Sequence, residues 1–222
     1  MIRLDSIDRR QALRYAGMRG DADTAISALA ETCEKRLLSV ISPRYIHRVY
    51  PLEFCENGIA CKGSHLLLTG ADIAAHLQGC SHAVLFCATL SQAADRAVRM
   101  AQAEDLTAGL LTDALASAAI EQVCDLAEAE ILAGLPDFHA TWRFSPGYGD
   151  LPLSLQGEFL DALDAQRKIG VCVSDSGLLL PRKSVTAIIG LSEKPIERHR
   201  KGCAACNLMN TCPYRAKGAH CK

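Results

Sequence analysis

The sequence predicts an α+β fold built around an antiparallel sheet. Helical and β-like segments share the chain, but they do not alternate in the regular order that produces a doubly wound parallel sheet. No glycine-rich phosphate loop follows a predicted strand, which argues against a nucleotide site of the Rossmann kind. With 222 residues, 49% of them hydrophobic, the chain is long and apolar enough to bury a full core.

The first half of the chain predicts one helix, three strands and a long helical region. Apolar residues recur at helical spacing over residues 22–40, after the suitable capping residues Asp21 and Asp23, and Ser42-Pro43 ends the pattern. Short apolar runs rich in aromatic or β-branched residues predict strands over 44–54, 66–68 and 83–90. Residues 91–133 are predicted to be helical, with a broad, alanine-rich apolar face.

The second half begins with a loop rich in glycine and proline, which holds Arg143 to Pro152. A helix is predicted over residues 154–168. Two β-like runs follow at 169–174 and 184–192, with glycine and proline between them.

Charge divides the chain into two predicted parts. The whole chain has 24 Lys and Arg against 25 Asp and Glu, which gives no reason to expect a nucleic-acid or membrane surface. From Lys194 onward, however, there are seven Lys or Arg and one Glu, a local balance of +6. We therefore expect one domain over residues 1–193 and a basic appendix over 194–222. The start of the chain lacks an apolar signal core, which favours a cytoplasmic location.

The loop from Trp142 to Pro152 combines a guanidinium, a phenol, glycines and prolines on one short irregular segment. Proline stiffens such a loop, and glycine lets it adopt unusual backbone angles. Composition alone is also compatible with a structural turn in which Tyr148 only packs. The seven histidines are dispersed and are expected to be surface or core residues rather than a catalytic set.

Three ordered motifs resemble the activation domain of cobalamin-dependent methionine synthase. The first is R-x-x-x-G-Y, from Arg143 to Tyr148. The second is an I-G…S-x-x-x-x-P-x-x-S-V pattern, matched by Ile169, Gly170, Ser176, Pro181, Ser184 and Val185. The third is the helix from Asp113 to Glu121. The resemblance spans residues 100–192, and the whole chain resembles a stand-alone form of the domain with a cysteine-rich tail.

This resemblance implies a curved antiparallel sheet flanked by helices, and a site for S-adenosylmethionine (AdoMet). It assigns Arg143 to the ligand carboxylate, since a guanidinium forms paired charge-assisted hydrogen bonds. Gly147 would allow close approach of the backbone, with Ser145 beside it, and Tyr148 would lie next to the reactive methyl. The family has an acidic residue where Ser117 stands here. Glu121, one turn further along, would serve instead, or would hold a salt bridge or helix cap.

The implied activity is reductive methylation of an inactive cobalamin, as one component of a methyltransferase system. An electron from flavodoxin or ferredoxin reduces cob(II)alamin on a partner cobalamin-binding methionine synthase module, and the product takes the methyl group of AdoMet. Since the cobalamin supplies the nucleophile, the protein contributes placement of the reacting atoms. Tyr148 is the residue expected beside them.

Four of the eleven cysteines crowd the tail, namely Cys203, Cys206, Cys212 and Cys221. Soft thiolates at this density favour a four-iron iron–sulfur cluster or zinc, although unliganded thiols are also compatible with the pattern. A cluster there would deliver electrons or help docking. The cysteines in apolar stretches, Cys33, Cys87, Cys124 and Cys172, are expected to be buried and inert.

Two other functions remain open from the sequence. One keeps the fold and makes the protein an iron–sulfur-bearing adaptor or electron donor for another corrinoid methyltransferase. The other is an ordinary AdoMet methyltransferase with a small-molecule acceptor, which the missing glycine-rich nucleotide loop disfavours.

Overall fold

The computed structural model describes residues 2–18 and 23–196. Within these ranges a six-stranded antiparallel sheet runs in the order β3-β2-β1-β4-β8-β5, beside a two-stranded ribbon of β6 and β7. The strands are β1 (Arg44–Cys55), β2 (Gly58–Cys61), β3 (Leu67–Leu68), β4 (His82–Thr89), β5 (His139–Ala140), β6 (Cys172–Val173), β7 (Leu179–Leu180) and β8 (Ser184–Ser192). The helices are α1 (Arg9–Tyr15), α2 (Thr24–Val40), α3 (Ala71–His76), α4 (Gln92–Glu104), α5 (Leu106–Ala133), α6 (Gln156–Leu163) and α7 (Ala165–Ile169).

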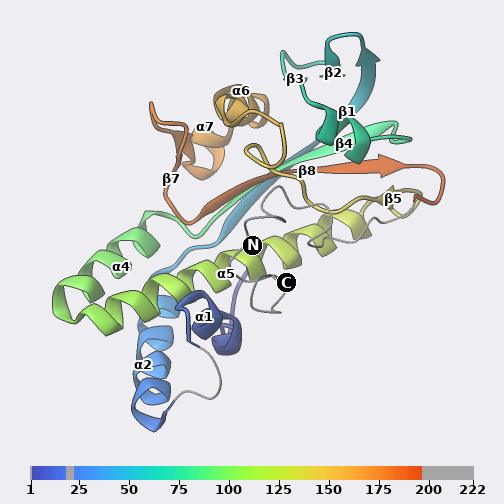
Figure 1. Ribbon diagram of the computed structural model, residues 1–222. Helices are drawn as coiled ribbons and strands as arrows, with labels where there is room; N and C mark the ends of the chain where they lie inside the picture. Colours follow the sequence, from blue (N-terminus) through green and yellow to red (C-terminus); the bar gives the residue numbers. More distant parts are fainter. Residues whose placement is uncertain (1, 19–22, 197–222) are drawn as a thin grey trace, which may run out of the picture.

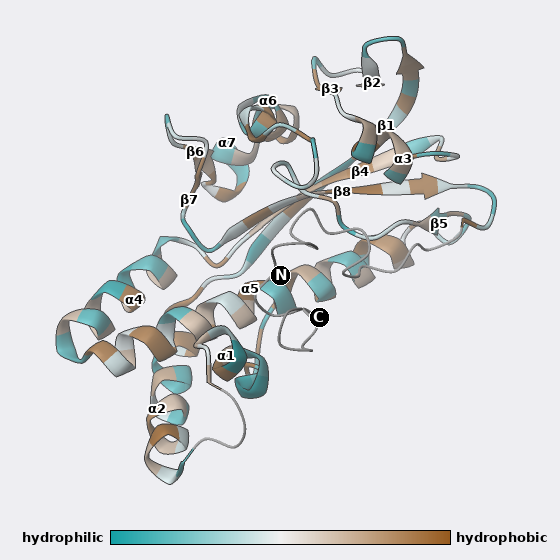
Figure 2. Cartoon of the chain, viewed as in Figure 1, coloured by the Kyte–Doolittle hydropathy of each residue, from teal (hydrophilic) through white to brown (hydrophobic). Residues whose placement is uncertain are grey.

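Helices cover both faces of the sheet (Figure 1). Alternate residues of the central strand β4 separate the two cores, as the period of a β-strand requires. Val84 and Phe86 face the core under α1, α2, α4 and α5, whereas Leu85 and Cys87 face the core under α3, α6 and α7. Figure 2 shows the hydrophobic colouring of β8, which lies between these two layers. The predicted α+β architecture with an antiparallel sheet is therefore confirmed.

The predictions for α2, β1, β4 and β8 are confirmed. Asp23 caps α2 by accepting a hydrogen bond from the backbone N–H of Ile26 at 2.7 Å. β1 and β8 both pair with β4 along the whole length of β4, so three segments of clear β character form the centre of the sheet. The register places Leu85 of β4 opposite Ile188 of β8.

The region predicted as helical over residues 91–133 contains two helices rather than one. Asp105 has an extended backbone (φ −157°, ψ 132°) and accepts a hydrogen bond from the N–H of Ala108 at 2.7 Å, so it ends α4 and caps α5. α5 then runs for 28 residues across the sheet. Its buried alanines allow close packing; they are Ala108, Ala114, Ala116, Ala118, Ala119 and Ala127.

The segment after the loop differs from its prediction. The helix expected over 154–168 is a short 3-10 turn followed by α6 and α7, which are separated by Asp164 in the left-handed region (φ 56°). A strand was expected over residues 169–174. Ile169 is instead the last residue of α7, and only Cys172–Val173 forms a strand, which pairs with β7. Helix α1, strand β2 and helix α3 were not predicted, because each is short and weakly patterned.

Most cysteines in the described residues are buried thiols. Burial raises the pKa of Cys61 and Cys87 to about 12 and that of Cys80 to about 11, so these side chains stay neutral and unreactive at physiological pH. The expectation of burial holds for Cys33, Cys87 and Cys124, but it is wrong for Cys172, which is partly exposed because β6 lies outside the main sheet. None of the described helices is long and apolar enough to cross a membrane.

Candidate functional site

The predicted loop contains a tight turn from Ser145 to Tyr148, and its residues suit the backbone angles of the turn. The N–H of Tyr148 donates to the carbonyl of Ser145 at 2.9 Å, and Gly147 has a φ of +90°. Proline at the second position and glycine at the third, with positive φ, form the combination that a type II turn requires. The N–H of Gly147 also donates to the carbonyl of Leu151 at 2.9 Å, which closes the loop on itself. Tyr148 is therefore presented from a turn of defined shape.

Two anchors hold this loop against the fold. Upstream, Phe144 exchanges two backbone hydrogen bonds with Ile188 of β8, at 2.9 and 2.7 Å. Downstream, the Asp150 carboxylate accepts from the N–H groups of Ala71 and Asp72 at 2.6 and 3.0 Å, while the Asp72 side chain accepts from the N–H of Asp150 at 3.2 Å. The loop is thus tied to the sheet at one end and to the start of α3 at the other.

Arg143 lies at the start of the loop and is buried, with 9% of its side chain exposed. It faces three carboxylates of α5. Its Nη2 atom lies 2.7 Å from Asp125 and 3.4 Å from Glu121, and its Nη1 atom lies 2.5 Å from Glu128. The three acids are spaced by four and three residues, so they share one face of the helix. Three carboxylates around one guanidinium leave this cluster with a net charge of −2.

The surroundings of Arg143 stabilise its positively charged form. Burial opposes the charged form, but hydrogen bonding to Asp125 and the neighbouring anionic groups outweigh it and raise the pKa of Arg143 above its ordinary value. The longest of the three contacts is the one to Glu121, whose side chain is 43% exposed. Glu121 therefore makes the weakest of the three contacts with Arg143, although Asp125 is more exposed.

A pocket of about 430 Å³ lies beside this cluster, within the size range of small-molecule sites (about 300–1,000 Å³). Residues from α1, α5 and the start of β8 surround it; they are Tyr15, Ser117, Ile120, Glu121, Arg182, Lys183 and Ser184. The Nζ atom of Lys183 forms a salt bridge with Asp113 at 2.9 Å and donates a hydrogen bond to the Ser117 hydroxyl at 2.9 Å. The lining therefore combines two basic residues, of which Lys183 is paired with Asp113, with the acidic Glu121 and the ring of Tyr15.

Tyr148 does not line this pocket, but it interacts electrostatically with Glu121 and Tyr15, which do. Partial burial and the negative charge of Glu121 raise its pKa, so the phenol stays protonated at physiological pH. Its ring packs edge-on against Phe144, with centroids 6.0 Å apart, and half of its surface is exposed. An exposed, neutral phenol on a fixed turn suits contact with a bound ligand or a partner.

His76 of α3 supports the segment that carries Arg143. Its ring lies 4.7 Å from the ring of Trp142 and 5.0 Å from that of Phe144, measured between centroids. Its Nε2 atom lies 2.8 Å from the hydroxyl oxygen of Thr141. Burial lowers the pKa of His76 to about 4, so the imidazole is neutral in the folded chain at pH 7. This packing places Arg143 opposite α5.

The structure brings together three of the residues singled out from the sequence, Glu121, Arg143 and Tyr148, and places Ser145 and Gly147 in the turn between the last two. Glu121 forms a salt bridge, one of the two structural roles that the sequence left open for it, and its partner is Arg143. Asp125, Glu128 and Tyr15 were missed. Asp125 and Glu128 could have been found from the sequence, because their helical spacing from Glu121 places them on the same face of α5. Nothing in the local sequence pointed to Tyr15.

The four tail cysteines, Cys203, Cys206, Cys212 and Cys221, lie outside the described residues, so the metal assignment stays a prediction. Among residues 2–18 and 23–196 the structure contains no group of three or more His, Cys, Asp or Glu side chains arranged to hold a metal ion.

Comparison with known proteins identifies the fold. No protein-family model and no curated protein matches the chain. Among solved structures, the chain is similar to the crystal structure of the MetH reactivation domain bound to AdoHcy, with a TM-score of 0.65 and 13% sequence identity. The similarity covers 86% of this chain and 75% of that chain. The chain therefore has the fold that the motif resemblance implied, an antiparallel sheet flanked by helices.

Proposed function

We propose that this chain binds AdoMet and donates its methyl group to a reduced cobalamin carried by a partner methionine synthase module. The observation that carries the proposal is the meeting of Arg143, Glu121 and Tyr148 beside one pocket, on a fold shared with a reactivation domain whose crystal structure holds AdoHcy. AdoHcy is the product left when AdoMet gives up its methyl group.

The charge cluster beside the pocket, of which Glu121 lines the pocket itself, is complementary to the positive charge of AdoMet. At neutral pH that molecule carries an ammonium, a sulfonium and a carboxylate, hence a net charge of +1. The cluster of Arg143 with Glu121, Asp125 and Glu128 carries −2 and attracts such a ligand. The amino-acid end of AdoMet inserts between Arg143 and Glu121, so that Arg143 binds the carboxylate and Glu121 binds the ammonium.

The G-Y turn supplies the rest of the site. Gly147, which has no side chain, lets the ligand lie against the backbone next to Ser145, and its φ of +90° disfavours other residues. Tyr148 is half exposed and lies beside the methyl group, where a cobalamin face has access to it.

The chemistry transfers one methyl group. The S–CH₃ bond of AdoMet breaks and a Co–CH₃ bond forms with the electron pair of the reduced cobalt, which leaves AdoHcy as product. A reduced flavodoxin or ferredoxin supplies the electron that first reduces cob(II)alamin. The chain itself aligns the methyl group with the cobalt and needs no acid–base residue.

An assay in trans tests this function. A cobalamin-binding methionine synthase module without its own activation domain is held as cob(II)alamin and mixed anaerobically with reductant, AdoMet labelled in the methyl group, and this chain. Label should appear on the cobalamin, and a reaction without the chain should show little. Equal labelling with and without the chain would contradict the proposal. Faster reduction without any AdoMet requirement would instead favour the electron-donor function.

A further inference from the structure

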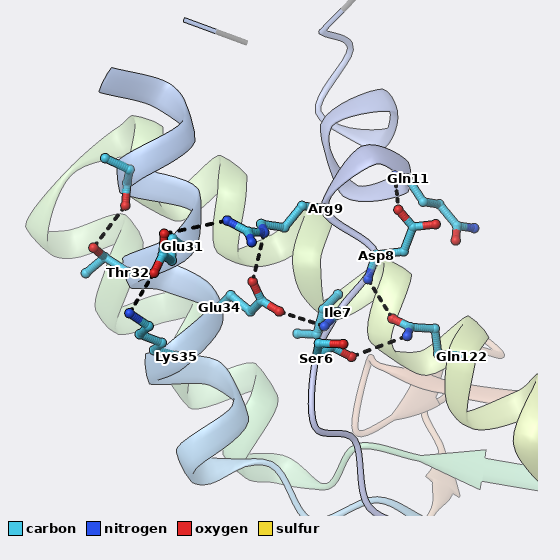
Figure 3. Close-up of polar contacts among 11 residues, drawn as sticks. Ser6, Ile7, Asp8, Arg9, Gln11, Glu31, Thr32, Glu34, Lys35 and Gln122 are labelled. Carbon is cyan, nitrogen blue, oxygen red and sulfur yellow. Dashed lines mark hydrogen bonds and ion pairs between the residues drawn. The ribbon is translucent and has the colours of Figure 1, made fainter. Parts of the chain in front are cut away.

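The N-terminal arm, residues 2–18, is firmly attached to two helices (Figure 3). The buried Glu34 of α2 accepts a hydrogen bond from the N–H of Ile7 at 2.7 Å and pairs with Arg9 at 3.2 Å. Gln122 of α5 accepts from the N–H of Asp8 at 2.9 Å and donates to the carbonyl of Ser6 at 3.3 Å. These contacts fix the arm against α2 and α5 just where α1 begins.

The arm contributes one aromatic side chain, Tyr15, to the lining of the pocket. Asp8 caps α1 by accepting from the N–H of Gln11 at 2.9 Å, and the helix ends at Tyr15. Gln11 also donates to the Tyr15 hydroxyl at 2.7 Å, which orients the phenol. Tyr15 is 47% exposed and lines the pocket together with Glu121. An oriented, exposed ring at the rim of a small-molecule pocket is available to a ligand.

We propose that Tyr15 contacts the sulfonium of bound AdoMet and makes the pocket prefer AdoMet to AdoHcy. This inference rests on the proposed function. Tyr15 and the acidic Glu121 both line the pocket, and Lys183, one of its two basic residues, is paired with Asp113. A sulfonium in this pocket is attracted to the ring of Tyr15, because the face of an aromatic ring attracts a cation. The thioether of AdoHcy is uncharged and gains little from the same ring.

Such a preference has a clear use. AdoHcy accumulates as the product of each methyl transfer and competes for the same pocket. A residue that binds the charged sulfur more strongly than the neutral one favours release of the product and entry of the next AdoMet.

Calorimetric titration of both ligands into the full chain and three variants tests the assignment. Tyr15→Leu should weaken AdoMet binding about 3- to 10-fold and AdoHcy binding less than about 2-fold. Tyr15→Phe keeps the ring and loses only the hydrogen bond from Gln11, so it should retain the preference for AdoMet over AdoHcy that Tyr15→Leu loses. Phe54→Leu is the matched control, since Phe54 is an exposed aromatic residue of β1 that does not line the pocket, and it should change neither affinity. Thermal unfolding of each variant checks that it is folded.

Two results would overturn the role of Tyr15 while the proposed function stands. One is an unchanged affinity for AdoMet in Tyr15→Leu. The other is an equal loss for AdoMet and AdoHcy, which would place the ring against a part that both ligands share, such as the adenine. If the parent chain binds neither ligand, the proposed function fails and the Tyr15 assignment falls with it.

Discussion

Replacing Arg143 with alanine should abolish tight AdoMet binding and lower the free energy of unfolding by roughly 3 kcal/mol. The guanidinium is buried and holds Glu121, Asp125 and Glu128 together, so its removal leaves three like charges on one face of α5. Urea unfolding measures the loss of stability. Arg36→Ala is the matched control, because Arg36 forms an exposed pair with Glu104 and such pairs contribute about 0–1 kcal/mol.

A second variant separates ligand binding from folding at this position. Arg143→Lys keeps the positive charge but loses the paired hydrogen-bond geometry of the guanidinium. It should fold, bind AdoMet more weakly, and bind methylthioadenosine, which lacks the amino-acid end, as the parent chain does. If Arg143→Lys weakened both ligands equally, Arg143 would be a structural residue of the α5 cluster and would not bind the carboxylate.

Lowering the pH from 7 to 5 should destabilise the chain by about 2 kcal/mol through His76 alone. Burial lowers the folded-state pKa of His76 from 6.5 to about 4. Between these values the unfolded chain binds a proton that the folded chain does not, so the stabilisation is complete above pH 6.5 and is lost as the pH falls toward 4. The measurement is urea unfolding at pH 7, 6 and 5.

Comparison with His76→Gln isolates this effect from other titrating groups. Glutamine retains hydrogen-bonding atoms near Thr141 but cannot take up the proton, so the variant should lose about 2 kcal/mol less than the parent chain over the same pH range. His65→Gln is the control, because His65 is exposed on the loop before β3, and it should follow the parent curve. Identical pH dependence in the parent chain and His76→Gln would show that His76 is not held neutral by burial.

The pH effect should extend to the candidate site. His76 packs against Trp142 and Phe144, the two neighbours of Arg143 in the chain. We expect a proton on His76 to disturb this packing and thereby the position of the guanidinium, which AdoMet titrations at pH 7 and pH 5 would detect as weaker binding at the lower pH.

Local sequence was a good guide wherever one element has a strong pattern of its own. β8 was predicted with its observed bounds because a continuous apolar, β-branched run has few alternatives. The G-Y turn was predicted as an irregular segment because proline and glycine impose its backbone angles. The division between α4 and α5 was missed because helix-favouring residues flank Asp105 on both sides, so that its capping role appears only in the three-dimensional structure.

The site itself was predictable only in part. The motif resemblance identified Arg143, Glu121 and Tyr148, which the fold then brings together. It did not reveal that Arg143 already holds three acids, although Asp125 and Glu128 follow Glu121 at helical spacing. Tyr15 gave no local signal, because its place at the pocket depends on contacts such as Glu34 with Ile7 and Gln122 with Asp8. Contacts between distant parts of a chain have no period that a sequence displays.

The most direct test of the central claim is anaerobic calorimetric titration of AdoMet into the purified full chain, alone and with a cobalamin-loaded methionine synthase module. The account predicts saturable binding to one site, and tighter binding when the module is present, because it proposes that cobalamin and AdoMet meet beside Tyr148. Absence of AdoMet binding in both titrations would contradict it, and the protein would then share the fold of a reactivation domain without its ligand.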